Sequence, residues 1–460
     1  MIAARARPNG PVLRATISLR LLYRCAESGV RPAVDRETGT RHRQVNARGR
    51  TPTALRHRDF ALLWSGQSIS LVGDGVYTVA LALEALRIDD HPLALSLVLA
   101  ARLLPTVLLL VAGGVIVDRV PRRFAMLASD TTRGVAVGTV ALLVALGAVQ
   151  VWELVVISAV FGAADALFYP AATAVTPEIL PAELLVQGSA LNHTSQTAAQ
   201  LLIGPALGGL VVAALGYQWA FAFDAMSFAV SAGCVLAMAS RPRPEPSGHS
   251  PLADARAGLR YVRSQRWMWV TIACAGLANF AAFSPLGVLV PLLIRNVLHQ
   301  GPIALGLVLA AGGVGGGMSA LLVAKLGAPR RRITWMWVGY GMSAAGIAVL
   351  SLAPNISVAG ACAFLVTGAL MYGNVLWSPI MQELVPPELL GRASSVDWLV
   401  SLSLSPLGVL AAGAAAGVIG TRATMLVGGC VALGLCGILF VPGVRDPERR
   451  LSSRIAPASR

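Results

Sequence analysis

Two short stretches, EILPAELL at residues 178–185 and ELVPPELL at residues 383–390, place two glutamates, a proline and a Leu-Leu pair in the same register. Proline ends helices, and the residue before it is restricted to extended conformations, so both stretches are expected to interrupt helical structure. A polar interruption that recurs half a chain apart predicts that the second half of the chain repeats the fold of the first.

The segments around these interruptions are apolar. Hydrophobic residues make up 55% of the 460 residues and charged residues only 13%, whereas soluble domains carry about 25% charged residues. A helix needs about 20 apolar residues to cross a bilayer, and helices satisfy their own backbone hydrogen bonds in lipid. The sequence therefore predicts an all-α membrane protein with twelve transmembrane helices in two pseudo-symmetric six-helix bundles. The expected spans are 60–86, 94–117, 124–148, 152–175, 188–215, 217–239, 268–295, 303–324, 333–352, 356–378, 393–417 and 422–442.

Basic residues gather in alternate loops, which sets the expected orientation because cytoplasmic loops are rich in Arg and Lys. The basic set includes Arg119, Arg122, Arg123, Arg241, Arg243, Arg256, Arg260, Arg263, Arg266, Lys325, Arg330, Arg331, Arg332 and Arg392, while the other set holds Arg87, Arg295 and Arg422. We expect a multi-pass protein of a bacterial plasma (inner) membrane, with both termini and the central loop in the cytoplasm.

The predicted organisation follows from these breaks. Residues 1–55 form a basic tail that we expect to be disordered, 56–240 an N-terminal six-helix bundle, 241–266 a cytoplasmic linker, 267–443 a C-terminal six-helix bundle and 444–460 a second tail. PRR at residues 121–123 is echoed by PRRR at 329–332, and GPALGGL from residue 204 by SPLGVL from residue 405. In the linker, Leu252, Leu259, Val262 and Trp267 fit a helix on the membrane surface, with a solvated tether as the alternative.

Several function classes are excluded. The single lysine, Lys325, belongs to no G-x-x-x-x-G-K loop, so ATP is not expected to drive this protein directly. The six cysteines form no C-x-x-C pair, and no metallohydrolase or nucleophile motif occurs. We therefore expect no enzyme activity, no metal and no cofactor. Because the basic surplus is mostly N-terminal, nucleic acid is not an expected partner.

GGVIVDRVPRR at residues 113–123 links the second and third spans. Its Gly114, Asp118, Arg119, Arg122 and Arg123 fit the pattern G-x-x-x-D-R-x-G-R-R, with Pro121 where the pattern has Gly. The stretch resembles the cytoplasmic signature loop of the major facilitator superfamily. The resemblance implies that the Asp and Arg residues form a charge network that latches the two halves. On the next helix, Asp130 and Arg133 are spaced as an internal pair that could join this network.

GPALGG in the fifth span is similar to the antiporter signature G-x-x-x-G-P-x-x-G-G of drug–proton exporters. Gly204, Pro205, Gly208 and Gly209 match it, and Gln200 replaces its first glycine. Glycines spaced by four allow close helix contact, and proline bends a helix. Packing alone would also produce this pattern.

Charged residues within spans are the candidates for proton coupling, because intramembrane charge is expensive and usually pairs or serves a pathway. We hypothesise an Asp74–Arg102 ion pair whose protonation couples to transport, with a static structural pair as the alternative. Asp165 is the second candidate protonation site. Asp224 and Asp397 are expected to pair helices, and Glu84 to be a solvated carboxylate.

Polar residues in other spans are candidates for lining a substrate cavity, or alternatively for hydrogen bonds between helices. They are Gln67, Tyr77, Asn192, Gln196, Asn279 and Asn374, with Trp377 beside them. His193 could titrate, but a lone helical histidine is more often a packing residue.

These features predict a secondary transporter that exports a hydrophobic or amphipathic small molecule by alternating access, with the proton gradient as its energy source. RDFALLWSGQSISLVGD from residue 58 and AFAFDAMSF from residue 220 are similar to stretches in the drug, macrolide and siderophore exporter branch. An importer of the same fold, or a transport-inactive membrane partner or sensor, is the alternative. The expected partners are the lipid bilayer, protons and one small molecule, and we expect a monomer.

Overall fold

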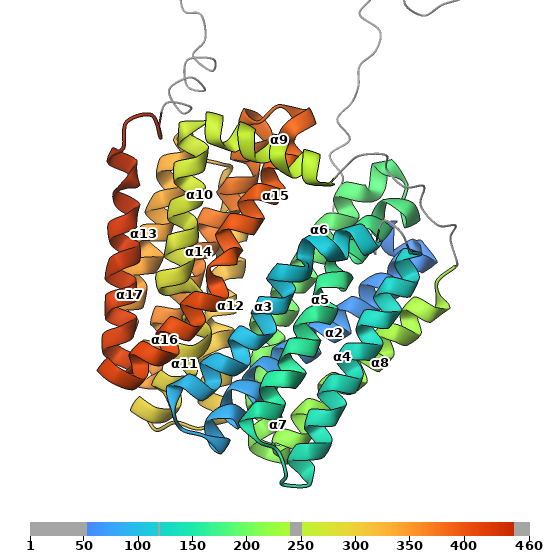
Figure 1. Ribbon diagram of the computed structural model, residues 1–460, viewed down its shortest axis with the longest axis vertical. Helices are drawn as coiled ribbons and strands as arrows, with labels where there is room; N and C mark the ends of the chain where they lie inside the picture. Colours follow the sequence, from blue (N-terminus) through green and yellow to red (C-terminus); the bar gives the residue numbers. More distant parts are fainter. Residues whose placement is uncertain (1–52, 118–119, 240–250, 446–460) are drawn as a thin grey trace, which may run out of the picture. The chain divides into compact units, whose positions relative to one another are not determined.

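The computed structural model describes residues 53–117, 120–239 and 251–445, in which every regular element is a helix. Within these residues, twelve helical spans are long and apolar enough to cross a membrane, as the sequence predicts (Figure 1). Most of each expected tail and residues 241–250 of the expected linker lie outside the described residues, and so do Asp118 and Arg119. All described residues belong to one compact unit.

The first half holds six spans. After η1 (Thr53–Arg56) they are α2 (Arg58–Ile88), α3 (Pro92–Val117), α4 (Arg122–Ala145), α5 (Val151–Ile179), a fifth span made of η2 (Ala182–Leu184), α6 (Leu185–Ala198), η3 (Ala199–Ile203) and α7 (Gly204–Leu215), and α8 (Tyr217–Ala237).

The second half follows helix α9 (Pro251–Ser264). Its spans are the seventh, made of α10 (Arg266–Ala278), η4 (Asn279–Phe283), α11 (Leu286–Leu292) and η5 (Leu293–Val297); then α12 (Pro302–Leu326), α13 (Arg332–Leu350), α14 (Ile356–Leu384), the eleventh made of α15 (Pro387–Ser403) and α16 (Ser405–Ile419), and the twelfth made of α17 (Thr421–Leu435) and η6 (Cys436–Phe440).

The two copies of the repeated stretch stop a helix in the same way. Helix α5 is capped by Leu180 at φ −116°, ψ 141°, and α14 is capped by Val385 at φ −99°, ψ 131°. Both residues precede a proline, whose ring excludes the helical conformation from the residue before it. The chain then turns and re-enters a helix, so the repeat marks equivalent turns in the two halves.

The fifth and eleventh spans both change helix geometry at a proline. Pro205 follows the π-helical turn η3 at the start of α7, and Pro406 lies in the first turn of α16. In each half the following glycine contacts the first span of that half. A Cβ on Gly208 would approach Val76 of α2, and one on Gly408 would collide with Phe280 of η4.

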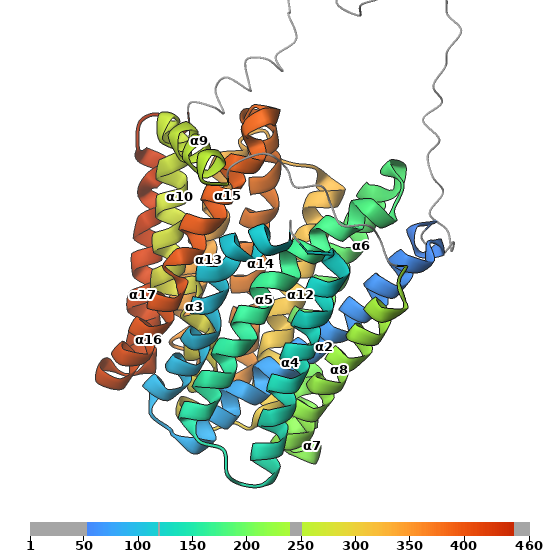
Figure 2. The same cartoon turned by 45° about the vertical axis from the view of Figure 1, so that its right-hand side comes forward.

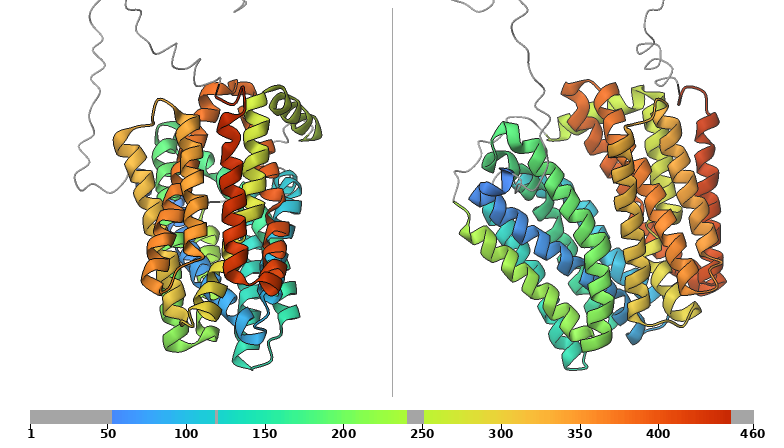
Figure 3. Two further views of the ribbon diagram at one scale, coloured as in Figure 1. Left: turned by 90° about the vertical axis from the view of Figure 1, so that its left-hand side faces the viewer. Right: turned by 180° about the vertical axis from the view of Figure 1, so that it is seen from behind.

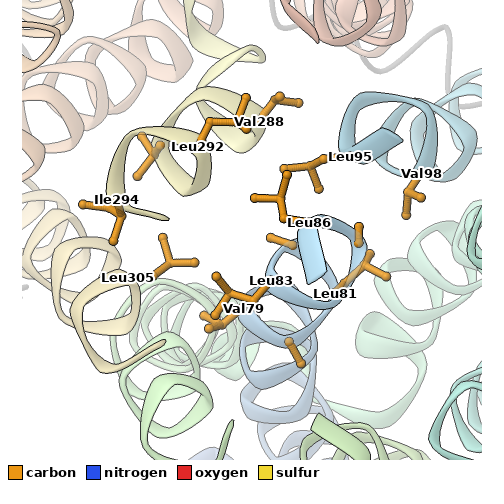
Figure 4. Close-up of a cluster of buried hydrophobic side chains, with 14 of the residues drawn as sticks. Val79, Leu81, Leu83, Leu86, Leu95, Val98, Val288, Leu292, Ile294 and Leu305 are labelled. Atoms are coloured by element: carbon orange, nitrogen blue, oxygen red, sulfur yellow. The ribbon is translucent and has the colours of Figure 1, made fainter. Parts of the chain in front are cut away.

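The halves pack against each other through two equivalent helix pairs, α7 with α12 and α3 with α16. Figure 2 and Figure 3 show these helices side by side from different directions. One apolar cluster joins the halves at the end opposite to Arg122 and Arg332. Figure 4 shows its residues on α2 and α3, such as Leu86 and Leu95, near Val288 and Leu292 of α11.

Candidate functional site

Three charged side chains from three helices meet in the middle of the first half. The Arg102 guanidinium of α3 lies 3.3 Å from the Asp165 carboxylate of α5 and 3.8 Å from the Asp74 carboxylate of α2. The side chain of Arg102 is 22% exposed, and those of Asp74 and Asp165 are each 10% exposed. One guanidinium is therefore shared between two carboxylates at a site that retains limited access.

Asp165 continues this contact to a second arginine. Arg133 of α4 donates to Asp165 over 3.0 Å and to Asp130 over 2.5 Å, and Ser231 of α8 donates to the other Asp130 oxygen over 2.7 Å. We call Asp74, Arg102, Asp165, Arg133 and Asp130 the ion network. The ion network ties together α2, α3, α4, α5 and α8, so it connects most of the first half at one level.

Aromatic rings cover both guanidiniums of the ion network. The Arg102 guanidinium lies 4.3 Å from the ring centroid of Phe161, and the Arg133 guanidinium lies 4.4 Å from Phe168 and 4.5 Å from Phe228. A cation over a ring face is attracted by the ring quadrupole, and this attraction grows when water is excluded. The rings thus stabilise charge within the bundle and separate it from lipid.

Tyr77 belongs to this aromatic cover, which corrects the prediction that it lines a cavity. Its ring is fully buried, stacks on Phe161 at 5.2 Å and meets Phe221 edge-on at 5.8 Å. Tyr77 and Asp74 do share one face of α2, as their spacing predicts, but that face points into the bundle. Burial depends on helix rotation, which spacing alone does not determine.

The sequence pointed to the members of the ion network but not to their connections. Asp74 and Arg102 do approach each other, yet Arg102 is nearer to Asp165. Asp130 and Arg133 pair as expected, and the structure joins them to Asp165. The contact of Asp165 with Arg133 could have been expected only from the similar depth of the two residues in neighbouring spans. No feature of the sequence pointed to the contact of Ser231 with Asp130.

The remaining acidic residues behave differently from one another. Glu84 was expected to be solvated, but it is fully buried and accepts two hydrogen bonds of 2.7 Å from Arg87, which neutralises it locally. Asp224 is also fully buried and accepts from Ser227 at 3.2 Å. Asp397 accepts from Trp377 at 2.7 Å and from Ser401 at 3.2 Å, so it ties α14 to α15.

The other cavity candidates divide between helix contacts and exposed positions. Asn279 donates to the Ser401 carbonyl over 3.1 Å, which joins the seventh and eleventh spans. Asn374 is exposed and accepts from the Tyr340 hydroxyl at 2.9 Å. Gln67, Asn192 and Gln196 are partly exposed. These four exposed or partly exposed residues remain candidates for contact with a substrate.

The repeated glutamates contact the repeated arginines. Arg122, at the start of α4, lies 2.5 Å from Glu178 near the end of α5. Arg332, at the start of α13, forms the equivalent ion pair with Glu383 near the end of α14. We call the end of the molecule that carries these two pairs the arginine-rich end. The pairing of one repeated motif with another was not expected from the sequence.

The other described signature arginine also acts within the first half. Arg123 donates to the carbonyls of Val235 and Leu236 at the end of α8, where the last carbonyls of a helix lack partners. Arg122 additionally donates to the Ala174 carbonyl over 2.6 Å. The described partners of Arg122 and Arg123 therefore fasten the first half internally, whereas the resemblance implied a latch between halves. Gly114 lies in the backbone of α3.

The GPALGG stretch of α7 contacts both its own half and the second half. A Cβ on Gly204 would lie 2.6 Å from Gly75 of α2, so that face of α7 is in backbone contact with the first half. A Cβ on Gly209 would lie 2.6 Å from the Pro302 carbonyl of α12, and Gly306 meets the Pro205 carbonyl equally closely. The glycines make α7 thin enough to pack against both halves at once.

Twelve helical spans in two equivalent halves, with close helix contacts between the halves and charge buried inside one of them, are the architecture of a secondary transporter. The chain belongs to the Major Facilitator Superfamily, whose family model matches residues 63–406.

Relatives with similar sequences carry transport names. The chain is 28% identical to the multidrug efflux pump Tap of Mycobacterium tuberculosis over 371 residues, which are 78% of this chain and 87% of that protein. It is 28% identical to Tap of Mycolicibacterium fortuitum, covering 84% and 95%. It is 22% identical to macrolide efflux protein A of Streptococcus pyogenes, covering 81% and 94%.

Solved structures with the same fold are more distant in sequence. A bacterial homologue of the lysosomal transporter Spinster, in an inward-facing and unoccupied conformation, superposes with a TM-score of 0.62 at 15% identity, covering 88% of this chain and 98% of that one. The nucleoside transporter NupG superposes with a TM-score of 0.65 at 11% identity, covering 83% and 98%. These similarities establish the fold alone.

Proposed function

We propose that this protein is a proton-coupled exporter of a hydrophobic or amphipathic small molecule, working by alternating access in a bacterial plasma membrane. The export direction is supported by the names of its relatives, a multidrug efflux pump and a macrolide efflux protein. The orientation, with both termini and the arginine-rich end in the cytoplasm, is supported by the distribution of arginine among the loops.

The observation that carries the coupling proposal is the composition of the ion network. It contains three carboxylates and two guanidiniums. Unbalanced charge is costly in a low-dielectric interior, so one bound proton would make the network neutral. The network also contacts five helices, so a change in its charge can alter how those helices pack.

Asp74 is the member that we assign to carry the proton. It has a single guanidinium contact, at 3.8 Å, and the Asp74 oxygen that faces Arg102 accepts no hydrogen bond. Asp165 by contrast touches two guanidiniums, at 3.0 and 3.3 Å. Protonation of Asp74 would release Arg102 to Asp165 alone, which changes the link between α2 and α3.

Purified protein in vesicles with a pH dye inside tests this proposal. A panel of hydrophobic compounds is screened for proton movement that depends on the compound and is lost with a protonophore. We expect Asp74→Asn to abolish coupled proton movement, and we expect Asp397→Asn, a matched aspartate of the second half, to keep it. Coupled movement that survives in Asp74→Asn would remove Asp74 from the role. Movement of the compound against its own concentration gradient toward the cytoplasmic side would favour an importer.

A further inference from the structure

We propose that helix α9 is a docking site for anionic lipid headgroups in the leaflet at the arginine-rich end. The site consists of an exposed strip of Arg256, Arg260 and Arg263 beside the exposed Leu259. This strip lies outside the ion network, and lipid binding there does not depend on the proposed function.

One face of α9 is fixed against the second half. Val262 is 3% exposed and belongs to an apolar cluster with Trp267 and Met268 of α10. A Cβ on Gly258 would lie 2.5 Å from the Arg392 carbonyl of α15, so the α9 backbone packs directly on α15. Because this face is fixed, the opposite face of the helix has a defined direction.

The opposite face carries the arginines. Arg256, Arg260 and Arg263 follow one another at intervals of four and three residues, which places them in one strip on a helix. All three are exposed, and none has an ion-pair partner among the described residues. Leu259 is 46% exposed. An arginine strip with an exposed leucine beside it combines phosphate binding with apolar contact, as surface-lying membrane helices do.

The position of α9 places this strip near the depth of lipid headgroups. Helix α10 begins at Arg266, directly after α9, and its first turn carries Trp269, which is 45% exposed and is of a residue type that gathers at membrane interfaces. Figure 1 shows α9 lying across the ends of α10 and α15, and the left view of Figure 3 shows it projecting from the bundle. The arginines thus face headgroups, where a guanidinium can bind phosphate through two hydrogen bonds.

A positive-inside bias explains why this loop contains arginine but not why the arginines are aligned on a docked helix. The loop between α12 and α13 provides the contrast. Lys325, Arg330 and Arg331 are located there too, but they are divided between a helix end and a turn. That loop is the matched control for total charge.

The experiment compares two triple variants of the full-length protein, each lacking three positive charges. Wild type, R256Q/R260Q/R263Q and K325Q/R330Q/R331Q are purified from membranes containing phosphatidylglycerol and phosphatidylcholine, and the bound lipids are counted by mass spectrometry. An interfacial basic residue strengthens binding to anionic lipid roughly fivefold. In the α9 variant we expect the ratio of bound phosphatidylglycerol to bound phosphatidylcholine to fall at least about tenfold. The control variant should keep the wild-type ratio.

Three results would overturn the proposal: equal loss in both variants, no loss in the α9 variant, or displacement of phosphatidylglycerol by millimolar inorganic phosphate. The last would show a free-anion site. R256K/R260K/R263K should keep the preference, because lysine keeps the charge. If R256Q/R260Q/R263Q fails to fold, amide exchange of the wild-type protein tests the proposal instead. Amide exchange in residues 251–264 must be slower in vesicles with phosphatidylglycerol than in pure phosphatidylcholine, and unchanged exchange would refute the site.

Discussion

Among single residues, Asp165 has the most connected position in the ion network. It accepts from Arg102 and Arg133 and thereby joins α3, α4 and α5. Asp74 is attached to the same network by one longer contact. Removing one partner of a buried ion pair leaves a charge without compensation, and the cost grows with the number of ion pairs that the substitution breaks. The two aspartates should therefore respond differently to the same substitution.

Asp165→Asn is expected to lower the free energy of unfolding by about 3–5 kcal/mol, because it breaks two buried ion pairs at once, those with Arg102 and Arg133. Asp74→Asn is expected to cost less, because it breaks one contact at 3.8 Å and leaves Arg102 paired with Asp165. Thermal unfolding of the purified protein in detergent measures both effects, with the Asp397→Asn variant as a control outside the network. A Tm drop for Asp74→Asn as large as that for Asp165→Asn would show that the network is not organised around Asp165.

The sequence could predict which charged residues lie within spans, because charge stands out against an apolar background. It could not predict how Arg102 divides between Asp74 and Asp165, since that depends on the rotation of α3 against α2 and α5. Tyr77 and Glu84 show the same limit. Spacing or position along a span predicts an exposed side chain for each, yet both are fully buried.

Among the helices and turns, the repeated stretch has two roles. Pro181 and Pro386 end the preceding helices, and Glu178 and Glu383 fasten those helix ends to α4 and α13. The turn was predictable, because the restriction before proline is local. The ion pairs were not, because each joins residues more than fifty positions apart in sequence.

Glu178→Gln and Glu383→Gln are expected to have small and similar effects, each less than about 1 kcal/mol, because both ion pairs are partly exposed to solvent. A double-mutant cycle with Arg122→Gln measures the first pair, and one with Arg332→Gln measures the second. Thermal unfolding at low and high salt gives the readout. Coupling energies that differ several-fold between the two cycles would contradict equivalent roles for the two copies.

Helix α12 allows a test of close packing with two glycines one turn apart. A Cβ on Gly313 would collide with the Leu201 carbonyl of η3, whereas a Cβ on Gly317 meets nothing within 4 Å. Gly317→Ala should stabilise the protein by up to about 1 kcal/mol, because alanine favours helix. Gly313→Ala should destabilise it by about 1–3 kcal/mol through overpacking between the halves. Tm values that shift alike in both variants would show that α12 and η3 do not pack this closely.

On the scale of the whole molecule, the fold is doubled but the buried charge is not. The ion network lies entirely in the first half, while in the second half Asp397 of the eleventh span accepts hydrogen bonds from Trp377 and Ser401. The twelve spans and their repeat were predictable from hydropathy and motif spacing. The contacts between halves were not, because they depend on glycine positions that look the same whether they face lipid or another helix.

At the end opposite to the arginine-rich end, the two halves make contacts that alternating access would have to break. Arg295 of η5 lies 3.0 Å from Asp90 and donates to the Leu83 carbonyl over 3.3 Å. Beside it, a Cβ on Gly417 of α16 would lie 3.1 Å from the His91 ring. The turn between α2 and α3 thus touches two parts of the second half.

Cross-linking this contact is expected to stop transport if the halves separate at this end in each cycle. In a background without the six native cysteines, His91→Cys and Gly417→Cys are joined by a short cleavable reagent, and uptake into vesicles is measured before and after cleavage. The matched control joins Gly138→Cys and Ala225→Cys, on α4 and α8 of the first half, where a Cβ on Gly138 would lie 3.8 Å from that of Ala225. We expect nearly complete, reversible loss for the pair between halves and unchanged transport for the control. Transport that continues with the first pair fully joined would show that this end stays closed throughout the cycle, so that access does not alternate between the two ends.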